Sequence, residues 1–129
     1  MNPGSSESEP IFWVVSSLDE LGEFPLEVRD TVGFTLFQAQ CGSRHPDTKI
    51  LKGFGSVQVL EVVENHSGDT YRAVYTVKFA GIVYALHAFQ KKSKSGVQTP
   101  KHEIDLIHAR LAWAKAHYEG WQNEQNSQS

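Results

Sequence analysis

Cationic side chains gather at one place in the second half of the sequence. Arg72 stands inside YRAVY, a run with strand-like alternation, and the pair Lys91 and Lys92 directly follows an apolar run. An arginine carries a fixed charge and a planar fork of donors that fits the oxygens of a phosphate. Held on adjacent antiparallel strands, these groups predict a site that handles a phosphodiester. The alternatives are an ion pair from Arg72 to Glu61 or Glu64 across a hairpin, and a solvated surface for the lysines.

The charge of the chain is unevenly distributed. Residues 1–43 hold one basic and seven acidic side chains, residues 44–101 hold nine and four, and residues 102–129 hold two and four. The segments therefore carry −6, +5 and −2, which gives the net charge of −3. A basic middle segment indicates either a solvated face or a site for a polyanion such as nucleic acid.

Metal and cofactor sites have no support in the sequence. The six histidines show no HxH or HExxH spacing, and one cysteine is present. A zinc site needs four convergent ligands, so we expect no metal. Glycine patterns typical of phosphate or dinucleotide loops are absent, no nucleophile-elbow pattern supports a catalytic triad, and we expect no cofactor.

The elements that position the cations are a meander of strands between two helices. Alternating apolar runs predict strands over 57–65, 70–79 and 82–89, joined by tight turns, and a short strand over 11–15. Pro25 and Gly42 bound one amphipathic helix, and Thr99 with Pro100 begins a second that ends at Gly120. The turn-rich stretch 43–56 is expected to be a loop.

We therefore expect a small single α+β domain, with a three-stranded antiparallel meander plus the N-terminal strand packed against helices. The domain is expected over 11–119, between a disordered tail over 1–10 and a flexible tail over 120–129. The lone Cys41 excludes an intramolecular disulfide, and we expect it to be buried at a helix end. The polar, acidic start is unlike a targeting peptide, and no apolar run is long enough for a membrane span, so we expect a cytoplasmic protein.

Several runs together resemble a known family. VLEVVENHSGDTYRAVYTVKF and HAFQKKSKSGVQTPKHEIDLIHARL, with LKGFGS before them, resemble the phage-derived, HigB-like branch of the RelE/ParE toxin superfamily over about residues 11–118. The strongest parts are YRAVY and HAFQKKS with TPKHEI. Arg72 matches the family arginine on the middle strand, and Lys91 and Lys92 match its lysine pair. Ser93 stands where many relatives carry threonine, and the loop after it is longer than in the shortest relatives.

The resemblance implies a toxin neutralised by a helix-turn-helix antitoxin, with which it forms a heterotetramer or a higher complex. It also implies an endoribonuclease that cuts mRNA at the translating ribosome without a metal, by attack of the 2′-hydroxyl on its own phosphate. Arg72 would stabilise the transition state, Lys91 or Lys92 would assist or transfer a proton, and His87 and Glu61 are further proton carriers. Other cations expected to contact RNA are Lys52, Lys78, Lys94 and Lys101.

Two other functions remain open at this point. A gyrase poison of the ParE type would need no ribonuclease site. A degenerate toxin would be a non-catalytic module that only binds its antitoxin. The set of Arg72, Lys91 and Lys92 favours the ribonuclease.

Overall fold

The sheet of this protein has five strands and is antiparallel except at one edge. The structure, a computed structural model, describes residues 9–55, 57–77, 79, 81–91 and 99–127. The strands lie in the order β1-β5-β4-β3-β2, and only β1 runs parallel to its neighbour β5. In chain order the elements are β1 (Ile11–Trp13), α2 (Ser17–Gly22), α3 (Leu26–Gln40), β2 (Thr48–Leu51), β3 (Val59–His66), β4 (Asp69–Thr76), β5 (Val83–Lys91) and α4 (Lys101–Ser127).

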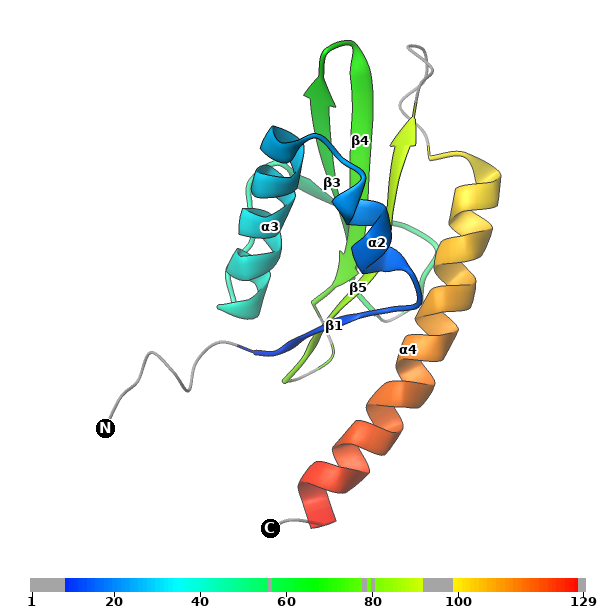
Figure 1. Ribbon diagram of the computed structural model, residues 1–129. Coiled ribbons are helices and arrows are strands. Elements are labelled where there is room, and N and C mark those ends of the chain that lie inside the picture. Colours follow the sequence, from blue (N-terminus) through cyan, green and yellow to red (C-terminus); the bar gives the residue numbers. More distant parts are fainter. Residues whose placement is uncertain (1–8, 56, 78, 80, 92–98, 128–129) are drawn as a thin grey trace, which may run out of the picture.

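The two long helices cover opposite faces of the sheet (Figure 1). One core lies between α3 and the sheet, where Val32 and Leu36 pack against Leu60 and Ala73. The other lies under α4, where Ile107 and Leu111 are buried with the β4 and β5 side chains that alternate toward that side. The short α2 packs on β5 beside the start of α4. The expected α+β class is confirmed.

The central meander forms as its sequence pattern predicts. β3 and β4 pair in register through a two-residue turn, in which Ser67 and Gly68 have φ of 51° and 86°. A turn with positive φ at both central residues matches the right-handed twist of the strands. β4 and β5 pair next, with a register shift after Val74, where Leu86 is the extra residue.

The structure corrects the sequence prediction in four places. The expected loop over 43–56 contains β2, which extends the sheet beyond β3. The six-residue α2 was not predicted. Cys41 is exposed rather than buried, because it follows the last turn of α3. α4 does not end at Gly120 but continues to Ser127, into the segment expected to be a flexible tail.

The far end of α4 is fixed by an aromatic contact. Trp121 packs against the core under α4 and lies over the β4–β5 turn at Gly81. Gly81 has φ of 91°, and a Cβ built on it would stand 2.8 Å from the Trp121 ring. This turn therefore needs glycine both for its backbone and for its contact with the helix. No helix in the described part of the chain is long and apolar enough to cross a membrane.

Candidate functional site

Arg72 is paired with Glu61 in the interior of the protein. The register sets Glu61 opposite Val74 and Arg72 opposite Val63, so the two charged residues are diagonal neighbours on the α4 face of the sheet. Arg72 Nη1 donates to Glu61 Oε1 over 3.2 Å, and the two side chains are 4% and 0% exposed. Of the two cross-strand ion pairs left open by the sequence, to Glu61 or to Glu64, the structure contains the pair with Glu61.

Two further residues complete this group, the Arg72 cluster, which consists of Lys49, Glu61, Arg72 and Thr99. Lys49 on β2 is directly opposite Glu61, and its Nζ lies 3.4 Å from Oε1. The Thr99 hydroxyl donates to Glu61 Oε2 over 3.0 Å and accepts a longer bond of 3.4 Å from Arg72 Nη1. With two cations and one carboxylate, the cluster carries a charge of +1.

Lys91 lies on the same face of the sheet as the Arg72 cluster. Arg72 pairs with Phe89 and Thr70 pairs with Lys91, so Lys91 is diagonally across from Arg72, at the end of β5. Its side chain is half-buried. Arg72 and one member of the lysine pair therefore share a face, as the strand pattern predicts; Lys92 lies outside the described residues.

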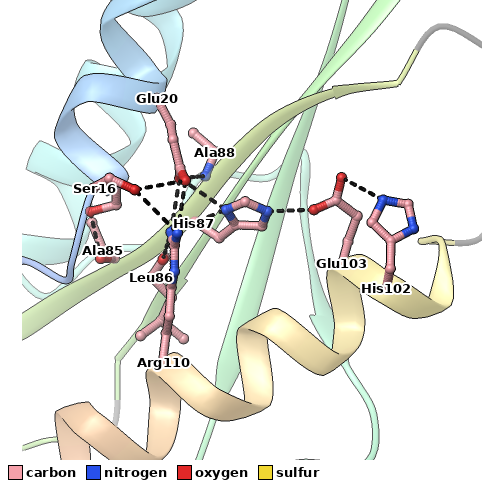
Figure 2. Close-up of polar contacts among 10 residues, drawn as sticks. Ser16, Glu20, Ala85, Leu86, His87, Ala88, His102, Glu103 and Arg110 are labelled. Atoms are coloured by element: carbon pink, nitrogen blue, oxygen red, sulfur yellow. Dashed lines mark hydrogen bonds and ion pairs between the residues drawn. The ribbon is translucent and has the colours of Figure 1, made fainter.

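His87 is enclosed between two carboxylates (Figure 2). Its Nδ1 lies 2.9 Å from Glu20 Oε1 on α2, and its Nε2 lies 2.5 Å from Glu103 Oε1 on α4. The side chain is 5% exposed. With both ring nitrogens engaged by protein groups, His87 has the geometry of a structural histidine rather than that of a proton carrier facing a substrate.

Arg110 completes a second group, the His87 network of Ser16, Glu20, His87, Glu103 and Arg110 (Figure 2). Its Nη1 and Nη2 donate to the two oxygens of Glu20 over 2.9 and 2.8 Å, and Nη2 also reaches the Ser16 hydroxyl. The arginine thus holds a carboxylate in a bidentate pair at the junction of α2, β5 and α4.

The pKa of Glu20 is well below its ordinary value. Partial burial opposes ionisation, but hydrogen bonds from His87, Arg110 and the Ala88 amide, and the charge of His87, together outweigh it. Glu20 is therefore a fixed negative charge. In the His87 network an arginine and a histidine lie against two carboxylates, whereas the Arg72 cluster has two cations against one carboxylate.

The sequence prediction missed Glu20, Glu103 and Arg110. Glu103 and Arg110 carried a usable signal, because they lie seven residues apart on the same helical stripe as the buried Ile107 and Ala114. A charged residue in an apolar stripe indicates a buried polar partner. Glu20 had no comparable signal, because the α2 segment is short and polar.

The remaining predicted RNA contacts are only partly described. Lys52 is exposed in the connection between β2 and β3. Lys101, at the start of α4, is 86% exposed and forms an ion pair of 2.8 Å with Asp105. Lys78 and Lys94 lie outside the described residues. In the part of the chain that the structure describes, no three His, Cys, Asp or Glu side chains are grouped as metal ligands.

Comparison with known proteins assigns this chain to a family. The model of the family described as "Phage derived protein Gp49-like" matches residues 19–112, a span that includes the Arg72 cluster and all of the His87 network except Ser16. A solved structure of a double arginine-to-alanine mutant of the E. coli toxin RelE, in the free state, is similar at 17% identity with a TM-score of 0.49. The similarity covers 63% of this chain and 81% of that one. No curated protein sequence matches at significant similarity. The expected phage-derived relationship is confirmed, and the chain belongs to the Gp49-like family of phage-derived proteins.

Proposed function

We propose that this protein is the toxin of a type II toxin–antitoxin system and acts as an endoribonuclease on mRNA at the translating ribosome. Its membership of the Gp49-like family and its sequence resemblance to the RelE/ParE superfamily support the toxin assignment. The observation that carries the nuclease assignment is the shared face of Arg72 and Lys91 on neighbouring strands. A helix-turn-helix antitoxin is its neutralising partner, and the two assemble as a heterotetramer or a higher complex in the cytoplasm, where translation takes place.

The proposed reaction needs no metal. The 2′-hydroxyl of one nucleotide loses its proton and attacks the adjacent phosphorus, and the bond from phosphorus to the 5′-oxygen breaks as that oxygen gains a proton. The products are a 2′,3′-cyclic phosphate and a 5′-hydroxyl. Arg72 stabilises the charge that develops on the non-bridging oxygens. Lys91 or Lys92 adds positive charge and transfers a proton.

Glu61 is a positioning residue in this mechanism. It holds the guanidinium of Arg72 in one orientation, and at 0% exposed it is too buried to reach RNA itself. The bond from Arg72 to the Thr99 hydroxyl, 3.4 Å, is longer than its bond to Glu61, 3.2 Å. A phosphate oxygen displaces this hydroxyl from Arg72, while Thr99 keeps its bond to Glu61.

A second candidate function is a non-catalytic module that only binds the antitoxin. One observation favours it: Arg72 is 4% exposed and already paired, as a purely structural arginine would be. The two candidates can be told apart by inducing the protein in cells. The ribonuclease cuts mRNA, whereas the binding module leaves mRNA intact.

The test is to induce the protein alone in bacteria, map new RNA 5′ ends and measure DNA supercoiling in the same cells. The proposal predicts cuts with 5′-hydroxyl ends inside translated frames, and fewer cuts when initiation is blocked. Intact RNA with normal DNA would support the binding module. DNA breaks with intact RNA would instead indicate a gyrase poison. Arg29→Lys, an exposed conservative change on α3, is the control that should cut as the wild type does.

A further inference from the structure

The outer edge of β5 is only partly covered by a neighbouring strand. β5 has nine residues, but β1 has three and pairs only with Val83, Tyr84 and Ala85. From Leu86 onward, no described strand lies along this edge. An edge of this kind carries backbone donors and acceptors that need other partners.

Beyond the part of the β5 edge that β1 covers, side chains of the His87 network bond to the backbone of β5. Arg110 Nη1 donates to the carbonyl of Leu86 over 2.9 Å, and the amide of Ala88 donates to Glu20 Oε1 over 3.1 Å. Figure 2 shows both contacts on the same edge of β5. Two positions of the edge are thereby satisfied by charged side chains rather than by backbone.

Gln90 is the next position along this edge. In an antiparallel pair, alternate residues direct both backbone groups away from the partner strand. Because the Ala88 amide points to Glu20, away from β4, and the register between Ala88 and Gln90 is regular, the amide and carbonyl of Gln90 point outward as well. The residue is exposed.

A groove lies along this part of β5. It has a volume of about 290 Å³, and α2 and the turn after it form its other side. The largely buried rings of Phe24 and Phe89 form part of its wall. Its negative charge comes from the exposed carboxylates of Asp19 and Glu23, because Glu20 is paired with Arg110. None of the described residues that line the groove is a lysine or an arginine.

We infer that this groove binds an extended basic peptide segment of a protein partner, which adds a short strand to β5 at Gln90. The backbone of the segment bonds to the outward amide and carbonyl of Gln90. Its lysine or arginine side chains lie beside the exposed carboxylates of Asp19 and Glu23. The exposed carboxylates of Asp19 and Glu23 disfavour RNA here, so this surface is distinct from the face that carries Lys91.

The inference can be tested with defined peptides on the full-length protein. The probe is an alternating lysine–valine hexapeptide, and its matched control is the glutamate–valine hexapeptide of equal length. Amide NMR spectra are recorded as each peptide is added to the isotope-labelled protein. We expect the basic peptide alone to shift the amides of Ala88, Phe89 and Gln90 in a saturable manner, with slower hydrogen exchange at Gln90.

Two variants separate the backbone from the charge contribution. Gln90→Pro removes the outward amide without removing a bond to β4. The fold should therefore remain, while the peptide response at this edge is lost. The control Gln90→Val keeps the amide and should respond to the peptide as the wild type does. The double change Asp19→Lys and Glu23→Lys should also abolish binding. Its control, Asp30→Lys with Glu119→Lys, makes the same charge change at exposed positions outside the groove.

Three results would overturn the inference. One is the absence of a saturable response to the basic peptide at Ala88–Gln90. Another is an equal response to the acidic peptide, or a response that survives the double change in the groove. The third is protection of Gln90 that rises with protein concentration alone, which would identify a second copy of the chain as the occupant. None of these outcomes depends on ribonuclease activity.

Discussion

Arg72 Nη1 and Glu61 Oε1 lie 3.2 Å apart on the face of the sheet that α4 covers. They form a buried ion pair between diagonal neighbours on β4 and β3. The pair joins two strands of the meander to the segment before α4, because Thr99 bonds to both members. The group proposed to act on RNA is therefore also part of the core. Its function and its contribution to stability must be measured on the same variants.

Removal of the carboxylate should destabilise the fold. In Glu61→Gln the buried guanidinium of Arg72 loses its counter-charge, and we expect the free energy of unfolding to fall by about 3–5 kcal/mol. Urea denaturation followed by circular dichroism measures this loss. Glu64→Gln, three residues along the same strand at a half-buried position, should change it by less than about 1 kcal/mol. Equal effects of the two changes would show that the Arg72–Glu61 pair does not stabilise the fold.

The His87 network should make stability depend on pH through Glu20. Its pKa is lowered on folding from the ordinary 4.5, so its contribution is complete above pH 4.5 and is lost as the pH falls toward the folded pKa. Wild type should exceed Glu20→Gln in stability above pH 4.5, and the difference should shrink below it. Glu119→Gln, at an exposed position, is the control. A difference that stays constant from pH 7 to pH 3 would contradict the depressed pKa.

Two glycines should respond to alanine in opposite ways. Gly81→Ala forces a positive φ on a residue with a Cβ and presses that Cβ on Trp121, so we expect a loss of about 1–3 kcal/mol. Gly120→Ala lies inside α4, where a Cβ meets no atom within 4 Å, and should gain about 0.5–1 kcal/mol. Thermal unfolding of both variants tests the docking of the last turns of α4. A neutral Gly81→Ala would show that Trp121 is not held on the turn.

The described lysines should contribute to RNA binding in proportion to their phosphate contacts. Counterion release predicts a slope of roughly −0.7 per contact for single-stranded RNA in a plot of log affinity against log salt. The double change Lys52→Gln and Lys101→Gln should therefore lower the magnitude of the slope by about 1.4. The control pair Arg29→Gln and Lys115→Gln removes two exposed charges that are not among the predicted RNA contacts. Identical slopes for both pairs would mean that Lys52 and Lys101 do not contact RNA.

The α+β class and the meander could be predicted from the sequence because their signals are local. Alternation in residues 70–79 is enough to set Arg72 on one face with Val74 and Thr76, and Ser67-Gly68 is enough to form the hairpin turn. β2 was missed because its four residues stand between turn-forming residues and are held by pairing with β3, which is not a local signal. The parallel direction of β1 likewise depends on the path through α2.

The burial of the site could not be predicted, because it depends on contacts between distant segments. Alternation assigns a face to Arg72, but only the docking of α4 and Thr99 determines that this face is covered at that point. His87 is enclosed by Glu20 and Glu103, which are 67 and 16 residues away in the chain. The resemblance predicts roles for Arg72 and His87. The structure adds that Arg72 is held by the buried Glu61, and His87 by the partly buried Glu20 and Glu103.

The most direct test of the account is RNA cleavage by purified Arg72→Lys, with its folding measured on the same sample. Lysine keeps the charge opposite Glu61, so we expect a folded protein with a lower thermal midpoint. It loses the planar fork, so cleavage should fall by on the order of 10²–10³, as when one preorganised donor is removed from a transition state. Arg29→Lys should cleave as the wild type does. Cleavage by folded Arg72→Lys at the wild-type rate would contradict the account and leave Arg72 with a structural role alone.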